Sequence, residues 1–207
     1  MTRRTKSSKR WIREHEADDF VKRAREEGWR SRAIFKLEEI QQRDRIIRPG
    51  MSVVDLGSAP GAWSQYARHL LKDSGAVFAL DILPMEPIAG VNFIQGDFCD
   101  EETLKKLVKL LAGKKIDLVM SDMAPNISGV SAVDQPRSMY LAELALEFAR
   151  EHLTPGGSLI VKVFQGEGSQ EFVADTRRSF GSVKVRKPKA SRPRSREVYL
   201  VARNFRL

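Results

Sequence analysis

Short apolar runs alternate with amphipathic segments from residue 51 onward, and this alternation restricts the fold more than any other feature. Strands are expected at 51–56, 76–81, 91–95, 116–122, 158–164, 183–187 and 196–203. Helices are expected at 63–71, 101–111, 134–153 and 172–180. Strands that alternate with helices form a parallel sheet covered on both faces. We therefore predict an α/β fold with a doubly wound, mostly parallel seven-stranded sheet and an antiparallel C-terminal strand.

The helix expected at 134–153 carries local signals at its start and along its core face. Asp134 can cap it, and Pro136 suits its first turn, where a missing N–H costs nothing. Its core face has apolar residues at helical spacing: Leu141, Leu144, Ala145 and Phe148. The sequence TPGG at 154–157 predicts a turn before the next strand.

The first 50 residues lack this alternation. Two short helices are expected near 16–28 and 31–43, broken near Gly28. We expect one domain in all, with three parts: a basic, flexible tail at 1–13, a helical extension at 14–50 and the α/β core at 51–207.

Positive charge is concentrated in two stretches of the chain. The net charge is +9, and residues 1–13 and 184–196 together hold thirteen basic residues and no acidic one. The rest therefore has 23 basic against 27 acidic residues. Either stretch alone could be a solvated tail, but the pair favours a polyanion, and we expect nucleic acid. A membrane surface is disfavoured because neither stretch has an apolar helical face.

Composition disfavours several classes of protein. No apolar run approaches the roughly 20 residues that cross a membrane, and no apolar segment follows the basic N-terminus, so we expect a cytoplasmic protein. The single cysteine, Cys99, excludes an intramolecular disulfide and a cysteine-based metal site. The three histidines, His15, His69 and His152, lack ligand-like spacing, so we expect packing or surface roles and no metal.

The first strand of the α/β core ends in a glycine-containing turn, V-V-D-L-G-S-A-P-G, at residues 53–61. In an open α/β sheet, ligands bind outside the carboxyl ends of the strands. Gly57 and Gly61 let the backbone approach such a ligand closely. The glycine spacing matches neither the dinucleotide pattern nor the phosphate loop, which argues against a site built for a phosphate.

Acidic residues stand near the carboxyl ends of successive strands. Asp55 lies in the first strand, Asp81 ends the second, Asp97 follows the third and Asp122 ends the fourth. Such acids can accept hydrogen bonds from ribose hydroxyls and an exocyclic amine, which suits a nucleoside with a positive charge, such as S-adenosylmethionine. Each acid alone is more often a turn or cap residue, so the inference depends on the set. Trp63, just after the turn, could line the same pocket.

Lys162 interrupts an otherwise apolar strand, S-L-I-V-K-V-F. Side chains alternate along a strand, so Ile160, Lys162 and Phe164 share one face. Lysine is almost never fully buried without a partner. Lys162 lies near the carboxyl end of its strand, where ligands bind, but an exposed lysine on an edge strand is the alternative.

Five motifs together resemble the FtsJ-type ribosomal RNA 2′-O-ribose methyltransferases. They are R-S-R-A-I-F-K-L (30–37), D-L-G-S-A-P-G-A-W-S-Q (55–65), S-D-M-A-P-N (121–126), V-K-V-F-Q-G (161–166) and S-R-E-V-Y (195–199). The likeness covers nearly the whole chain from about residue 11. It implies a Rossmann-like class I methyltransferase fold with S-adenosylmethionine as cofactor. The implied reaction methylates the ribose 2′-hydroxyl of a uridine in the 23S RNA of the large ribosomal subunit.

The resemblance also implies a catalytic set of four residues: Lys36, Asp122, Lys162 and Glu197. Burial and a second cation would favour a neutral amine on Lys162, and the two carboxylates would oppose this. Lys162 could therefore accept the hydroxyl proton or steer the alkoxide as a cation. We favour Lys162 as the acceptor and Lys36 as an electrostatic and positioning group.

Other functions are compatible with parts of the sequence. A methyltransferase acting on a small molecule or protein would need neither the basic stretches nor the lysine-bearing strand. A methyltransferase acting on another RNA, such as tRNA, and a non-catalytic RNA-binding module are further alternatives, the latter disfavoured by the complete set of four. The expected partner is 23S ribosomal RNA within the large subunit, and we expect a monomer, although the sequence is silent on oligomeric state.

Overall fold

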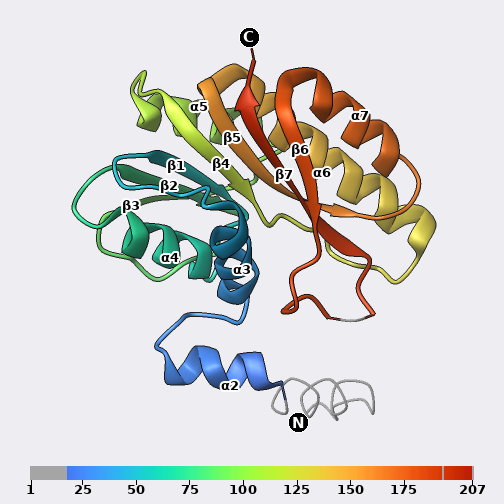
Figure 1. Ribbon diagram of the computed structural model, residues 1–207, viewed down its shortest axis with the longest axis horizontal. Coiled ribbons are helices and arrows are strands. Elements are labelled where there is room, and N and C mark those ends of the chain that lie inside the picture. Colours follow the sequence, from blue (N-terminus) through green and yellow to red (C-terminus); the bar gives the residue numbers. More distant parts are fainter. Residues whose placement is uncertain (1–17, 193, 207) are drawn as a thin grey trace.

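The computed structural model describes residues 18–192 and 194–206, and within them the strands form one sheet in the order β3-β2-β1-β4-β5-β7-β6 (Figure 1). The strands are β1 (Ser52–Leu56), β2 (Ala76–Asp81), β3 (Val91–Gln95), β4 (Ile116–Ser121), β5 (Leu153–Phe164), β6 (Phe180–Arg186) and β7 (Glu197–Phe205). Neighbouring strands are parallel except for β7, which is antiparallel to both β5 and β6. The predicted mostly parallel sheet with an antiparallel C-terminal strand is confirmed.

Helices cover both faces of this sheet, as Figure 1 shows. They are α2 (Asp19–Glu26), α3 (Ile34–Asp44), α4 (Ala62–Leu71), α5 (Glu101–Leu111), α6 (Ser131–His152) and α7 (Ser169–Ser179). One hydrophobic cluster joins the sheet to α3 and α4, and the other joins it to α5, α6 and α7. Each face therefore has its own core, as expected for a doubly wound sheet.

The side chains of β5 alternate between these two cores. Leu159, Val161 and Val163 belong to the cluster that contains α6, whereas Ile160 belongs to the cluster that contains α3. Lys162 lies on the Ile160 face and its side chain is only 7% exposed. The predicted face is confirmed, and the alternative of a solvent-facing edge lysine is wrong, because β5 lies between β4 and β7.

Helix α6 begins at Ser131, three residues before the predicted start. Asp134 lies inside the first turn rather than at the cap, because its carboxylate accepts hydrogen bonds from the backbone N–H groups of Ser128 and Gly129, both at 2.9 Å. Pro136 consequently lies beyond the first turn. The helix is thus started by a loop that folds back onto Asp134.

The TPGG segment interrupts the pairing of β5 rather than preceding the strand. Ile116 pairs with Leu153, and the next pair is Leu118 with Ser158, so residues 154–157 are looped out between them. A β-bulge of this kind inserts extra residues without ending the strand. The predicted turn is therefore real, but the strand starts before it.

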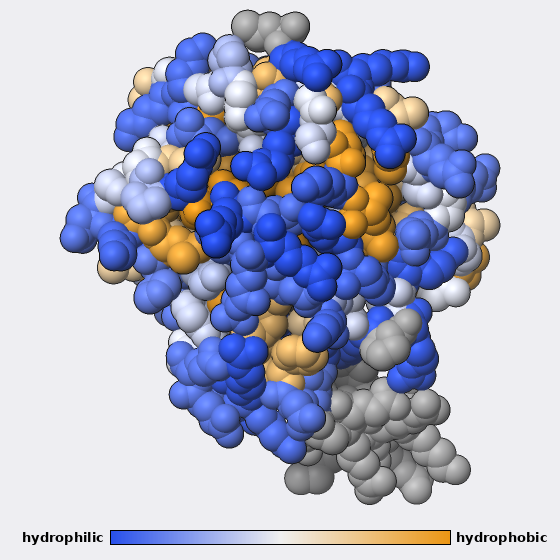
Figure 2. All heavy atoms as spheres, in the orientation of Figure 1, coloured by the Kyte–Doolittle hydropathy of each residue, from blue (hydrophilic) through white to orange (hydrophobic). Residues whose placement is uncertain are grey.

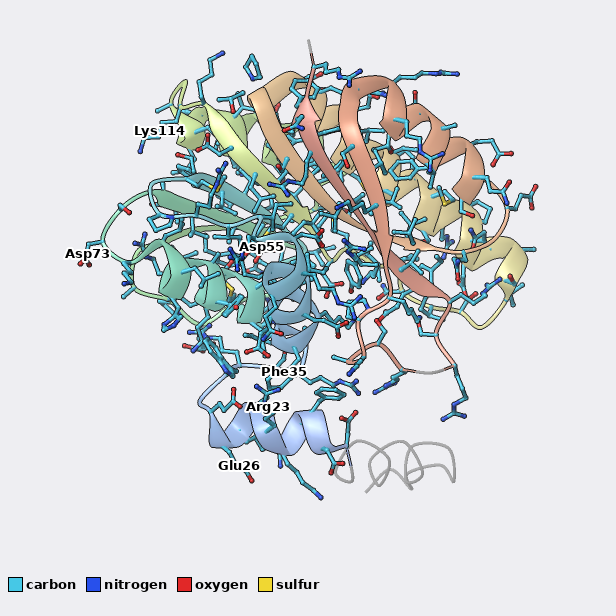
Figure 3. All side chains as sticks on the ribbon, viewed as in Figure 1. Arg23, Glu26, Phe35, Asp55, Asp73 and Lys114 are labelled. Atoms are coloured by element: carbon cyan, nitrogen blue, oxygen red, sulfur yellow. The ribbon has the colours of Figure 1, made fainter. Side chains whose placement is uncertain are left out.

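Helix α2 packs beside the start of α3. The rings of Phe20 and Phe35 lie 5.6 Å apart, and the Arg23 guanidinium lies 4.2 Å from the centre of the Phe35 ring (Figure 3). Gly28 follows α2 with a positive φ of 74°, which supplies the predicted break. The predicted tail at 1–13, which includes Trp11, lies outside the described residues, and so does His15.

The surface in view is largely hydrophilic, with apolar side chains showing mainly in gaps between charged ones (Figure 2). Among the described residues, no helix has both the length and the apolar character that a membrane crossing requires.

Candidate active site

Five polar side chains form a continuous chain at the carboxyl end of the sheet. Glu197 Oε1 lies 2.9 Å from Lys36 Nζ, which donates to the Tyr199 hydroxyl at 3.1 Å. Tyr199 donates to Asp122 Oδ1 at 2.6 Å, and Lys162 Nζ lies 3.1 Å from the same oxygen. The structure therefore brings together all four residues implied by the resemblance and adds Tyr199 between them.

The positions of these residues follow from the sheet. Lys162 on β5 stands directly opposite Tyr199 on β7, and Glu197 is two residues earlier on β7, so its side chain shares a face with Tyr199. Asp122 follows β4 and donates its backbone N–H to Leu56 O at 3.1 Å. Tyr199 lies in the S-R-E-V-Y motif, but no site role was predicted for it, although its spacing of two from Glu197 was a usable signal.

Lys36 enters the site from α3, outside the sheet. Buried neighbours on both sides, Phe35 and Leu37, pack this part of α3 against the core and leave the Lys36 side chain 14% exposed. The Trp63 indole N–H donates to Ala33 O at 2.8 Å, and its ring lies 5.6 Å from Tyr199. Trp63 is buried and its ring packs against Tyr199, so it supports the site from below, and its predicted contact with the cofactor stays a prediction.

The charges in this chain alternate, and the pKa values shift accordingly. Burial raises the pKa of Asp122, but Lys162, Lys36 and the Tyr199 hydroxyl outweigh it and hold this pKa below its usual range. Burial likewise opposes the effect of Lys36 on Glu197, whose pKa is also lowered. Burial, reinforced by the two carboxylates, raises the pKa of Tyr199 well above 10. The carboxylates are therefore ionised and the phenol is a neutral donor near pH 7.

The predicted glycine turn lies against this chain. Gly57 has φ of 77°, and a Cβ there would lie 2.9 Å from both N and Cα of Met123. Gly61 has φ of 106°, and a Cβ there would lie 2.7 Å from Met85 Sδ and 2.8 Å from Ile88 Cδ1. Both positions combine a left-handed backbone with a close approach, so only glycine fits without strain.

Asp81 and Asp97 flank the same turn. The two carboxylate oxygens of Asp81 accept the backbone N–H groups of Ala59 and Leu83, each at 2.8 Å. Asp97 is exposed, and its Oδ1 accepts the Cys99 N–H at 2.9 Å. Each carboxylate oxygen has two lone pairs, so both acids retain capacity to accept from a bound ligand.

Asp55 is fully buried beneath the turn, near the centre of the sheet (Figure 3). Its Oδ2 accepts from the Ser64 hydroxyl at 2.6 Å, whereas its Oδ1 has no hydrogen-bond partner among the described residues. Burial raises the pKa of Asp55 to about 7, with Asp122 and Asp81 adding to the effect and Ser64 reducing it. Asp55 thus supports the turn from below.

A pocket of about 490 Å³ opens on the other side of Lys36 and Glu197. Its wall includes four arginines, Arg32, Arg192, Arg194 and Arg196, and two apolar residues, Ile127 and Phe164. Volumes of 300–1,000 Å³ with a few convergent polar groups are typical of ligand sites. The basic, partly apolar wall suits an unpaired nucleotide better than a neutral metabolite.

The basic stretch 184–196 is not a tail, since most of it joins β6 to β7. Arg186 pairs with the buried Asp44 at 2.7 and 2.6 Å, and Lys187 donates to the carbonyls of Ser195 and Glu197 at 2.6 and 2.5 Å. These two residues hold the connection in place, and the arginines after them line the pocket. Only part of this charge is therefore available to a polyanion.

Comparisons with known proteins show which family and fold this chain resembles. The sequence profile described as FtsJ-like methyltransferase matches residues 29–205. The chain is 59% identical over 205 residues to the ribosomal RNA large subunit methyltransferase E of Alkalilimnicola ehrlichii, which covers 99% of this chain and 98% of that protein.

Solved structures resemble the fold. A structure described as a ribosomal RNA methyltransferase from Plasmodium falciparum superposes with a TM-score of 0.77 and 31% identity, covering 86% of this chain and 98% of that one. The methyltransferase MycE of the mycinamycin biosynthetic pathway, solved with Mg and SAH, has a TM-score of 0.54 and 16% identity, covering 91% of this chain and 49% of that one. At this low identity, the second likeness supports the fold alone.

Proposed function

The chain belongs to the FtsJ-like methyltransferase family, and from this premise we propose how its residues carry out the reaction. The protein is an S-adenosylmethionine-dependent methyltransferase of the large-subunit ribosomal RNA, and it methylates a ribose 2′-hydroxyl. We propose that the acceptor is a uridine, and that the enzyme acts as a monomer, in the cytoplasm, on RNA within the large subunit.

One observation carries the proposed mechanism. The chain from Glu197 through Lys36, Tyr199 and Asp122 to Lys162 has the glycine turn on one side and the arginine-lined pocket on the other. A cofactor at the turn and a ribose at the pocket would therefore meet at these side chains. This arrangement supports transfer to a hydroxyl rather than binding alone.

S-adenosylmethionine supplies a methyl group on a sulfonium as the electrophile and leaves as S-adenosylhomocysteine. We assign the residues that would hold it to the turn and the acids around it: Gly57, Gly61, Asp81, Asp97 and Asp122, with the fully buried Asp55 acting through the turn that it supports. The two glycines allow close approach of the backbone, and the acids offer acceptors for hydroxyl and amine groups. The protein thereby contributes orientation and electrostatics.

Lys162 is assigned as the proton acceptor. It donates to the Asp122 carbonyl oxygen at 2.5 Å and lies 3.1 Å from Asp122 Oδ1, which leaves one direction at Nζ for the substrate hydroxyl. The acceptor is the neutral amine, so Lys162 must first release its own proton to solvent. As the new O–C bond forms and the S–C bond of the cofactor breaks, the hydroxyl proton then passes to this nitrogen, which restores the ammonium. General-base help of this kind is worth about 10²–10⁴-fold in rate.

Lys36 and Tyr199 are assigned to positioning. Lys36 is held between Glu197 and the Tyr199 hydroxyl, so its charge is fixed at the edge of the pocket. A fixed cation stabilises negative charge that develops on the attacking oxygen. Tyr199 links this cation to Asp122, so that the two lysines keep a constant separation.

The test uses purified protein, methyl-labelled S-adenosylmethionine, and either naked ribosomal RNA or large subunits lacking the modification. A methylated 2′-oxygen cannot attack the adjacent phosphodiester, so label should survive alkali in an uncleaved dinucleotide. Digestion to nucleosides should then yield 2′-O-methyluridine. The better of the two RNA substrates identifies whether assembly precedes methylation.

Three outcomes would contradict the proposal. Label in an alkali-released mononucleotide would mean methylation of a base. Label in another 2′-O-methylnucleoside would show that the acceptor is not a uridine. Absence of label from ribosomal RNA, with transfer to tRNA or protein, would show that ribosomal RNA is not the substrate.

A further inference from the structure

Arg30 and Arg32, which are separated by a single residue, lie in the segment between α2 and α3. Their guanidinium groups bind different parts of the molecule. Arg32 bonds the Asp18 carboxylate and the carbonyl of Ala190, on the side of the basic pocket. Arg30 instead donates to three carbonyl oxygens beside the glycine turn. Its position in a basic motif suggests RNA binding, but three of its five N–H donors are used within the protein.

The three acceptors of Arg30 come from two different loops. Nη1 donates to Pro60 O at 3.1 Å, in the glycine turn, and to Glu86 O at 2.5 Å. Nη2 donates to Pro87 O at 2.8 Å. Glu86 and Pro87 lie in the loop that connects β2 to β3, so a single guanidinium links this loop to the turn. The planar fork of arginine can do this, whereas the point charge of lysine cannot reproduce it.

Packing around Gly61 reinforces this link. A Cβ on Gly61 would lie 3.3 Å from Arg30 Cδ, in addition to its contacts with Met85 and Ile88. The turn, the β2–β3 loop and the Arg30 stem therefore touch at one point. Without the guanidinium, three carbonyl oxygens from two loops would converge with no donor between them, which would push the loops apart.

Helix α4 fixes the backbone of Arg30 from a third side. The Arg30 N–H donates to Gln65 Oε1 at 3.2 Å, and Gln65 Nε2 donates to Gly28 O at 3.1 Å. Gln65 thus holds the backbone at Gly28 and at Arg30, on either side of residue 29. The side chain is held at its base as well as at its tip.

We propose that Arg30 is a positioning residue of the cofactor site, which sets S-adenosylmethionine affinity by fixing the turn against the β2–β3 loop. The proposal rests on the assignment of this turn to the cofactor. Arg30 acts through the two loops, so its loss should change cofactor binding without changing the groups that surround the acceptor hydroxyl.

The experiment compares Arg30→Lys and Arg30→Met with Arg25→Met, which removes an exposed arginine on α2. Calorimetry with S-adenosylhomocysteine should show binding weakened about tenfold in Arg30→Met, less in Arg30→Lys, and unchanged in Arg25→Met. The KM for S-adenosylmethionine should rise in parallel, whereas kcat at saturating cofactor and the Kd for RNA should stay within about twofold.

Two results would overturn the proposal. Unchanged cofactor binding in Arg30→Met with weakened RNA binding would make Arg30 an RNA contact. An equal loss of cofactor and RNA binding in Arg30→Lys, with a lowered melting temperature, would make its role structural only. Both results concern binding, so they are separate from the methyl-transfer assay that tests the proposed function.

Discussion

The two sides of the active site are built in different ways. The proposed cofactor side consists of backbone: a turn with two left-handed glycines, and acids whose oxygens accept main-chain N–H groups. The acceptor side consists of long side chains from α3, β5 and β7 that pair with one another. Geometry fixes the first side, and charge pairing fixes the second. Substitutions should therefore separate the two sides by the kinetic parameter that they change.

The largest expected effect is on the acceptor side. Lys162→Ala removes the proposed proton acceptor, and kcat should fall about 10³-fold. Calorimetric binding of S-adenosylhomocysteine should change little, since the turn does not depend on this side chain. The control is Lys106→Ala, an exposed lysine on α5. If cofactor binding is lost together with transfer, the division into two sides does not hold.

The next effect tests the place where the two sides touch. Gly57→Ala puts a Cβ against the backbone of Met123, beside Asp122, at a positive φ. Cofactor affinity should fall roughly hundredfold because strain and overlap add. Gly113→Ala has a similar φ of 72° with nothing within 4 Å, and it should cost stability alone. Equal cofactor affinities in the two variants would show that the Met123 contact is dispensable.

A third prediction concerns Asp55 and pH. Its pKa is about 7 in the folded protein against 3.8 ordinarily, so the folded state retains a proton that the unfolded chain releases between these values. Stability should therefore fall as pH rises from about 4 to 7. Asp55→Asn removes this dependence. The difference between the free energies of unfolding of the variant and of the native protein should therefore shift in favour of the variant by on the order of 2 kcal/mol between pH 5 and pH 8. Urea unfolding at several pH values measures this, and a constant difference would contradict it.

The smallest effect should come from Tyr199→Phe, which keeps the ring and removes the hydroxyl. The variant loses the donor to Asp122 and the acceptor for Lys36, and kcat should fall about tenfold. Because the hydroxyl helps to lower the pKa of Asp122, the acidic limb of the pH–rate profile should move to higher pH. An unmoved limb would show that Tyr199 only fills space.

The difference between the two sides of the site also explains which of its residues could be predicted from the sequence. The glycine turn is one contiguous motif after a strand, so its position could be predicted from local pattern. Tyr199 could not be assigned so directly, because its hydroxyl meets Asp122 and Lys36, which lie 77 and 163 positions away in the sequence. The resemblance supplied Lys36 and Glu197, which lie 161 positions apart and meet only through the fold.

The errors at the level of elements have local causes. Asp134 was predicted to cap α6, but a carboxylate can equally accept N–H groups from residues before a helix, as it does from Ser128 and Gly129. The stretch 184–196 was predicted as one charged segment. Its roles diverge because Arg186 finds the buried Asp44, a partner 142 residues away that composition cannot reveal.

The pairing of Lys162 with Tyr199 also bears on how the chain folds. If β7 shifted by one residue along β5, Lys162 would face Val198 or Leu200, and the two polar groups would lie on opposite faces of the sheet. Such a slip would take the Tyr199 donor away from the buried Asp122 carboxylate and both Tyr199 and Glu197 away from Lys36, at a cost in free energy. The residues of the proposed active site thus also fix the register of β7, the last strand in sequence order, so that a misaligned C-terminus would be unstable as well as inactive.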